Sequence, residues 1–230
     1  MKPFEVFAQN NNLSFNNLAV LEQAFVHRSY LNEHKEIGIG HNERLEFLGD
    51  AVLELIITDY LYKTFPDKHE GDLTSYRAAL VNANTLAIVA ETVGVNQALL
   101  LSKGEARDMG RARNYILADT MEAVIGAIYV DRGYDTAHDF ILKHIVPLLD
   151  GIIANASWID AKSRFQEISQ DKTGITPVYK TIKEEGPDHD KHFTVGVYLG
   201  DEVMGEGEGK SKQEAEQLAA RDALHKKGWA

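Results

Sequence analysis

Residues 42–65 are the part of the sequence that most limits the possible folds, because apolar residues recur at helical spacing over their whole length. The stretch follows a Gly-Ile-Gly turn and stops at Pro66, whose ring cannot continue a helix. Three carboxylates in it, Glu43, Glu46 and Asp50, occupy positions i, i+3 and i+7, which places them within about 60° of arc on one helix face. The sequence therefore predicts one long helix with an acidic face.

A second acidic pair, Asp119 and Glu122, lies within ILADTMEAVIGAIYV, where most neighbours are apolar. Each acidic pair alone is equally consistent with solvated surface or with stabilisation of a helix start. Carboxylates buried on apolar helices would repel one another and cost several kcal/mol to desolvate, so a cation must compensate them. Because two oxygen-rich pairs on two helices are a recurring way to hold divalent ions in a bundle, the pairs together predict a site for one or two hard cations.

Composition narrows the kind of metal and the kind of partner. The chain has no cysteine, which excludes thiolate zinc sites and disulfides and favours Mg²⁺, with Mn²⁺ as a substitute. We expect no small-molecule organic cofactor. No apolar run approaches the roughly 20 residues that span a bilayer, and the first residues lack a signal-peptide pattern, so we expect a cytoplasmic protein without a membrane partner. The net charge of −11 means that nucleic acid could bind only through local basic patches.

The character of the sequence changes after Gly151. Up to about residue 150 the periodicity is helical, with a domain expected over 3–133 and long helices over 114–130 and 134–149. Residues 151–160 are expected to form a linker, and 161–229 a separate α+β module. Its expected order, α-β-β-β-α, comprises a helix over 161–172, strands over 176–184, 192–199 and 201–208, and a helix over 212–227.

The segment NERLEFLGDAVL resembles the signature of the ribonuclease III family. QAFVHRSYLNE, EGDLTSYRAALVNANTLA, ILADTMEAVIGAIYVDRGY and the C-terminal module also resemble the family in order and spacing, so that the similarity covers nearly the whole chain. The resemblance implies an all-α N-terminal endonuclease domain of the RNase III fold. It also implies that the α+β module is a double-stranded-RNA-binding domain.

The resemblance carries site residues with it. It assigns metal binding to four carboxylates: Glu46, Asp50, Asp119 and Glu122. Of these, Asp50 and Glu122 match the pair on which catalysis depends. Glu43 matches a supporting position, and Glu70 matches an acidic residue that is either structural or close to the site. Metal ions can activate water and stabilise the leaving 3′ oxygen of a phosphodiester, which agrees with the 5′-phosphate and 3′-hydroxyl ends that the family produces.

In the second module the resemblance assigns RNA contacts to five residues. Gln166 and Glu167 on the first helix match residues that reach a minor groove, and His189 lies in a loop that reaches the next one. Lys210 and Lys212 stand at the start of the last helix, where the helix dipole adds to their charge and favours phosphate.

Other basic residues are weaker candidates for phosphate contacts. His27 and Arg28 could act on phosphate, although a histidine at the end of an apolar helix is more often a hydrogen-bonded core residue. Further candidates for contacts with the RNA backbone are Arg44, Arg77, Lys103, Arg107, Arg111 and Arg113.

The resulting hypothesis is a magnesium-dependent endonuclease of double-stranded RNA that processes ribosomal and messenger RNA precursors and could also process transfer RNA. The resemblance also implies a homodimer joined along the 42–65 helix, whose exposed apolar edge includes Phe47. One alternative is a catalytically silent double-stranded-RNA-binding protein. Another is a metal-dependent phosphohydrolase of nucleotides, which the C-terminal module disfavours.

Overall fold

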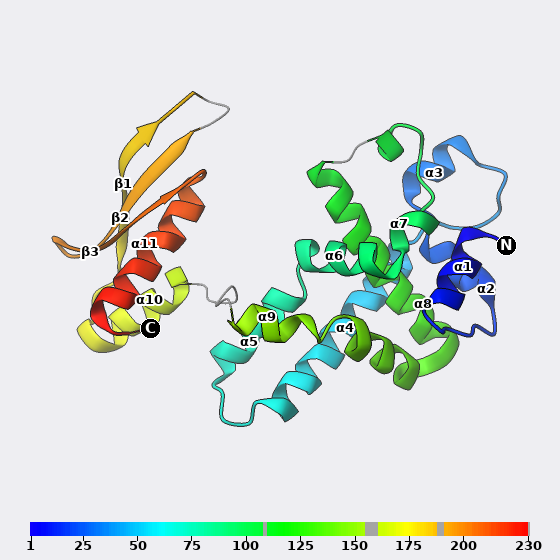
Figure 1. The fold of residues 1–230 in the computed structure, drawn as a ribbon, viewed down its shortest axis with the longest axis horizontal. Coiled ribbons are helices and arrows are strands. Elements are labelled where there is room, and N and C mark those ends of the chain that lie inside the picture. Colours follow the sequence, from blue (N-terminus) through cyan, green and yellow to red (C-terminus); the bar gives the residue numbers. More distant parts are fainter. Residues whose placement is uncertain (108–109, 155–160, 188–190, 230) are drawn as a thin grey trace. The chain divides into compact units, whose positions relative to one another are not determined.

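A computed structural model describes residues 1–107, 110–154, 161–187 and 191–229. Its internal contacts divide the chain into two compact units, Met1–Trp158 and Ile159–Ala230. The described part of the first unit is built from helices, and that of the second from a three-stranded antiparallel sheet with two helices (Figure 1). The predicted fold class, an all-α domain followed by an α-β-β-β-α module, is confirmed. None of the described helices combines the length and apolar character needed to cross a membrane.

The helices of the first unit follow the predicted periodicity closely. The long helix expected over 42–65 is observed as Glu43–Thr64. The elements are α1 Pro3–Asn10, α2 Leu18–Ala24, α3 Arg28–Glu33, α4 Glu43–Thr64, α5 Glu70–Leu80, α6 Ala83–Val93, α7 Val95–Ala98, a 3₁₀ turn Glu105–Arg107, α8 Arg111–His144 and α9 Leu148–Ala154.

Some helix boundaries in the first unit differ from the sequence expectation. The helix expected over 114–130 and most of the helix expected over 134–149 are joined as α8, which is interrupted at Gly133, where φ is 81°. α8 ends at His144, and the last two residues of the second expected helix, 148–149, belong to α9. The segment 151–154, expected to begin a linker, continues α9, because Ile152 and Ile153 are half-buried against the core. The rest of the expected linker lies outside the described residues.

The core of the first unit forms where α4 packs against α8 (Figure 1). Its largest fully buried side chains include Leu53, Ile56, Ile57, Leu117, Met121 and Ile125. The two helices approach most closely at a pair of glycines. A Cβ atom on Gly49 would lie 1.8 Å from the carbonyl oxygen of Glu122, and one on Gly126 would lie 2.2 Å from that of Leu45. Only glycine permits this backbone contact.

The start of α4 is anchored to the end of α2. Asn42 precedes the helix and is almost fully buried. Its backbone N–H donates to the carbonyl of Val26 at 2.9 Å, and its side-chain amide donates to that of Ala24 at 3.2 Å. These bonds fix the position of the first, acidic turn of α4 relative to the remaining helices.

The second unit packs two helices on one face of its sheet. It consists of α10 Ala161–Thr173, β1 Val178–Glu185, β2 His192–Leu199, β3 Glu202–Gly209 and α11 Lys212–Lys227, with strand order β1-β2-β3. Phe165, Val197 and Leu224 are at the centre of its core. Gly205, Gly207 and Gly209 alternate along β3 and leave space for the backbone of α11, so this glycine-rich run belongs to the strand.

Candidate active site

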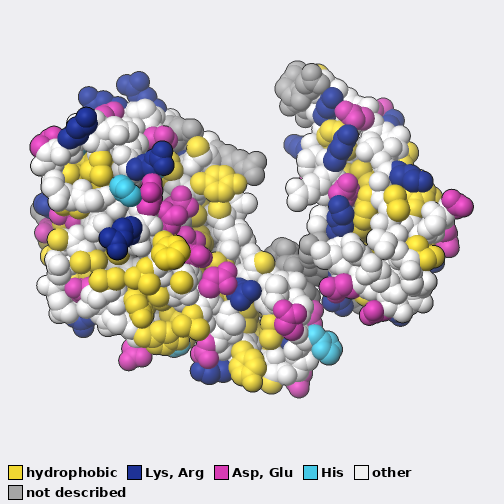
Figure 2. Space-filling model, turned by 180° about the vertical axis from the view of Figure 1, so that it is seen from behind, with side chains coloured by type: hydrophobic (Ala, Val, Ile, Leu, Met, Phe, Trp, Pro, Cys, Tyr) yellow, Lys and Arg dark blue, Asp and Glu magenta, His cyan; other side chains and the backbone are white. Residues whose placement is uncertain are grey.

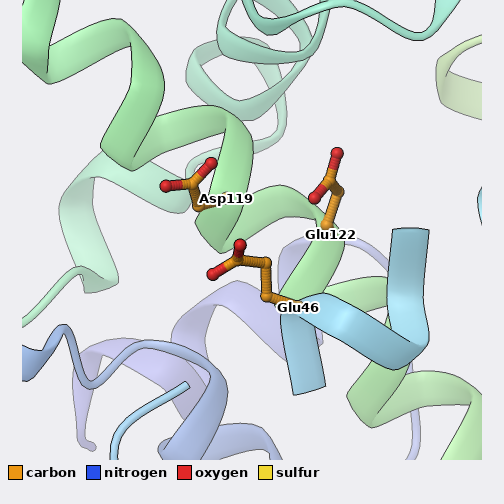
Figure 3. Close-up of side chains that lie close together, drawn as sticks. All are labelled: Glu46, Asp119 and Glu122. Carbon is orange, nitrogen blue, oxygen red and sulfur yellow. The ribbon is translucent and has the colours of Figure 1, made fainter. Parts of the chain in front are cut away.

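Three carboxylates from two helices converge beside the glycine contact. Glu46 projects from α4, and Asp119 and Glu122 project from α8 (Figure 3). One oxygen of each lies within 4.8 Å of one oxygen of the others. Glu46 precedes Gly49 by one helical turn and Glu122 precedes Gly126 by one turn, so the close approach of the helices brings the acids together.

The environment of the cluster opposes its negative charge. Burial, and then repulsion by Asp50 and Asp119, raise the pKa of Glu122 from 4.5 to about 8. Burial and then the charge of Asp119 raise the pKa of Glu46 from 4.5 to about 7. Burial also raises the pKa of Asp119. In the absence of a cation, the cluster therefore retains protons near neutral pH.

The donor set fits a divalent cation. All three residues offer oxygen, the ligand atom that Mg²⁺ and Mn²⁺ prefer. Among the side chains that the structure describes, no lysine or arginine forms an ion pair with Glu46, Asp119 or Glu122. A bound cation would supply the missing positive charge and favour the ionised carboxylates.

Asp50 and Glu43 flank this cluster. Asp50 is exposed and falls outside the group of three, yet its charge contributes to the raised pKa of Glu122. Glu43 is held by Arg28 at 3.6 Å and by His41 at 3.7 Å. It lines a groove of about 540 Å³ that also contains Glu46 and Asp119.

His27 lines the same groove. It caps α3, and its Nδ1 lies 2.8 Å from Ser29 Oγ and accepts the backbone N–H of Ser29 at 3.3 Å. It is thus hydrogen-bonded, as expected for a structural histidine, but half-buried at the wall of the groove. Glu105 and Tyr115 also line the groove, and sequence reasoning missed them because they belong to no acidic pair.

Glu70 lies apart from the carboxylate cluster. It is the first residue of α5, is exposed, and accepts a hydrogen bond from Thr74 Oγ1 at 3.0 Å. Together with Tyr62 and Phe65 it lines a cavity of about 720 Å³ near the end of α4. Within one subunit, the structure therefore does not bring Glu70 to the acidic site.

The candidate basic residues of the first unit differ in how freely their side chains could contact an RNA phosphate. Arg77 contacts Glu54 at 3.2 Å and Thr58 at 3.0 Å, so its guanidinium is engaged beside α4. Arg113 is half-buried and donates to the side chain of Asn96. Exposed candidates are Arg28, Arg44, Lys103 and Arg107, whereas the side chain of Arg111 lies outside the described part.

The structure places four of the five expected RNA contacts on the second unit's surface. Gln166 and Glu167 are exposed on α10, and Lys210 and Lys212 are exposed at the start of α11. His189 lies outside the described residues.

Comparisons with known proteins identify both parts of the chain. The family described as Ribonuclease-III-like matches residues 17–149, and the double-stranded RNA binding motif matches residues 161–227. Ribonuclease 3 of Enterococcus faecalis is 47% identical over 210 residues, covering 91% of each chain. Ribonuclease 3 of Desulforamulus reducens is 46% identical over 210 residues, covering 91% of this chain and 85% of that protein.

A solved structure agrees with this relationship. The nuclease domain of ribonuclease III from Campylobacter jejuni is 37% identical to this chain and superposes with a TM-score of 0.57. That match covers 64% of this chain and 96% of the Campylobacter domain. A second structure of that domain, with a TM-score of 0.56 and 36% identity, describes flexibility in a region involved in dimer formation.

A helical nuclease domain followed by a double-stranded-RNA-binding motif defines a class of two-domain ribonucleases that act on RNA duplexes. The chain belongs to the ribonuclease III family. It is an endoribonuclease rather than a catalytically silent RNA-binding protein.

Proposed function

We propose that the chain hydrolyses phosphodiester bonds of double-stranded RNA at the carboxylate cluster, using Mg²⁺ or Mn²⁺ held by Glu46, Asp119 and Glu122, with Asp50 completing the site. The observation that supports this most directly is the convergence of three carboxylate oxygens within 4.8 Å of one another (Figure 3). One or two divalent cations held by these residues would supply Lewis acidity for activating water and for stabilising charge on the leaving 3′ oxygen.

The protein's own residues prepare this chemistry. Because their pKa values are raised, Glu46 and Glu122 would hold a cation only after losing their protons, and the cation's charge would favour that loss. Glu43, fixed by Arg28 and His41, holds a negative charge at the groove wall next to Glu46. Attack by water, rather than by the RNA 2′-hydroxyl, gives 5′-phosphate and 3′-hydroxyl ends.

The second unit would supply substrate recognition. Gln166, Glu167 and His189 would contact minor grooves, and Lys210 and Lys212 would contact phosphates between them. Such contacts recognise duplex shape and not sequence, so they do not select particular transcripts. Membership of the ribonuclease III family favours structured precursors of ribosomal and messenger RNA as substrates, and these could include precursors of transfer RNA. We place this activity in the cytoplasm.

The active form would be a homodimer joined along α4. Three side chains on one face of this helix, Phe47, Leu55 and Tyr62, are 81%, 57% and 72% exposed. Hydrophobic side chains gather on one face of the nuclease unit, with acidic side chains running beside them (Figure 2). A two-fold axis near Leu55 would pair antiparallel α4 helices and bring Phe47 of each subunit to the 720 Å³ cavity at the end of the other α4.

Cleavage of a long RNA duplex tests the proposed activity. With Mg²⁺ we expect short duplexes with 5′-phosphates, 3′-hydroxyls and two-nucleotide 3′ overhangs, produced by a species that sediments at twice the chain mass of 25.6 kDa. Two sites on opposite strands would account for the overhang. Binding without cleavage would support the silent alternative, and hydrolysis of free nucleotides alone would support the phosphohydrolase. Cleavage by a species that sediments at the mass of one chain would mean that activity does not require the dimer.

Stability should depend on pH with the sign set by the carboxylate cluster. Without metal, folded Glu46 and Glu122 keep their protons to about pH 7 and 8, whereas an unfolded chain loses them near 4.5. The free energy of unfolding should therefore fall as the pH rises from about 4.5 to about 8. Added Mg²⁺ binds the ionised form, so it should raise the melting temperature strongly at about pH 8.5 and little at about pH 5.5. An equal Mg²⁺-dependent increase at both pH values, measured by thermal unfolding, would contradict this assignment.

A further inference from the structure

One carboxylate in the RNA-binding module lies between two lysines. Glu184, near the end of β1, places one oxygen 2.9 Å from Nζ of Lys191 and the other 3.7 Å from Nζ of Lys212. Lys212 is the first residue of α11 and is one of the proposed phosphate contacts. The proposed RNA-contacting lysine is therefore already paired with an anion in the RNA-free protein.

The sheet register directs Glu184 toward the start of α11. Glu184 is paired with Phe193 of β2, which is in turn paired with Gly209 of β3. Gly209 faces α11, since a Cβ atom there would lie 2.8 Å from the backbone nitrogen of Ala215. The ammonium of Lys212 lies 5.4 Å from the centroid of the Phe193 ring. Side chains at paired positions share a face, so Glu184 is on the face from which α11 begins.

Side chains engage part of the backbone at the start of α11. Ser211 Oγ accepts the backbone N–H of Glu214 at 3.1 Å, and the Glu214 carboxylate accepts the backbone N–H of Lys210 at 2.7 Å. With these two N–H groups engaged, the ammonium groups of Lys210 and Lys212 carry the formal positive charge that attracts a phosphate to this helix end. A carboxylate that engages one of these ammonium groups therefore reduces the positive charge that a phosphate meets there.

We propose that Glu184 is an affinity-limiting residue that competes with RNA phosphate for Lys212 and Lys191. The inference rests on the proposed phosphate contact of Lys212. A phosphate that reaches Lys212 either displaces the carboxylate or shares the ammonium with it, and in both cases the charge of Glu184 repels that phosphate. Hydrogen bonding to Lys191, and then the charges of Lys191 and Lys212, keep the pKa of the Glu184 carboxyl below its ordinary value, so this competitor stays ionised.

The neighbouring Glu185 provides a matched control. It alternates with Glu184 along β1, so its side chain points to the opposite face of the sheet, where it pairs with Lys183 at 2.8 Å. Glu184→Gln and Glu185→Gln change the net charge of the chain equally. Only the first removes a carboxylate from Lys212.

The test measures binding of the full chain to an RNA duplex of about 20 base pairs in EDTA, by fluorescence anisotropy over a range of salt concentrations. Glu184→Gln should tighten binding by on the order of two- to fivefold at low salt. It should also steepen the dependence of log K on log salt by up to roughly 0.9 for a further phosphate that Lys212 neutralises. Glu185→Gln should change both quantities much less. Lys212→Gln should weaken binding.

The outcomes separate the inference from the proposed contact. Equal tightening by Glu184→Gln and Glu185→Gln would mean that only net charge matters, and would overturn the inference. Unchanged or weaker binding by Glu184→Gln would also overturn it; weakening would mean that Glu184 positions the lysines for RNA. If Lys212→Gln leaves binding unchanged, the proposed phosphate contact fails, and the inference fails with it.

Discussion

Replacing Glu122 by glutamine is expected to lower the rate of duplex cleavage at saturating Mg²⁺ by at least about a thousandfold. The amide keeps the size of the side chain but removes the charge that a cation needs. Glu122 contributes one of the three converging oxygens. Duplex affinity should stay within about twofold, because the RNA-binding motif occupies residues 161–227. Single-turnover cleavage and duplex binding in EDTA measure the two effects separately.

Stability should change in the opposite direction to activity. Glutamine mimics the protonated form of Glu122, which burial and neighbouring charges favour. Without metal at about pH 9, Glu122→Gln should therefore melt at a higher temperature than the wild type. Glu91→Gln, on the exposed side of α6, is a matched control and should alter neither property. Near-normal cleavage by Glu122→Gln would exclude Glu122 as a required metal ligand.

Asp50→Asn is expected to lose cleavage to a similar extent. This variant tests whether Asp50 completes the site.

The helices could be predicted because local signals mark their ends. Pro66 stops α4, and Gly133, at a positive φ, interrupts α8 where the sequence indicates a break. The order of helices and strands in the second unit could also be predicted, because turn residues separate its strands. The end of α9 was missed because burial of Ile152 and Ile153 depends on tertiary packing and not on a local stop signal.

The acidic site could be predicted only in part. Helical periodicity places Glu46 and Asp50 on one face, but it does not determine how far along that face a neighbouring helix remains within reach. The structure therefore brings Glu46 to Asp119 and Glu122 and leaves Asp50 exposed at the edge. Similarly, the pairing of Glu184 with Lys212 depends on the register between a strand and a helix.

The two glycines that set the distance between α4 and α8 could be recognised in the sequence, because glycine inside a helix is destabilising and its presence there indicates close packing. Gly126→Ala is expected to destabilise the nuclease unit by roughly 2–4 kcal/mol. The added Cβ would lie 2.2 Å from the carbonyl oxygen of Leu45, a backbone atom that can yield only if the helices separate. Separation would also move Glu122 away from Glu46, so cleavage should fall even below the melting temperature.

Gly71→Ala distinguishes this packing effect from the general response to replacing a helical glycine. Gly71 lies in α5, and a Cβ atom there would have no neighbour within 4 Å. This variant should be neutral or more stable by up to about 1 kcal/mol, since alanine reduces the freedom of the unfolded chain. Denaturant unfolding and the Mg²⁺ concentration required for cleavage measure the two consequences.

If Gly126→Ala were as stable as Gly71→Ala and cleaved at the same Mg²⁺ concentration, the helix contact could not be what brings the carboxylates together. A stable Gly126→Ala variant that needs more Mg²⁺ would instead mean that α4 and α8 separate at little cost, with the distance between Glu46 and Glu122 still governing metal affinity.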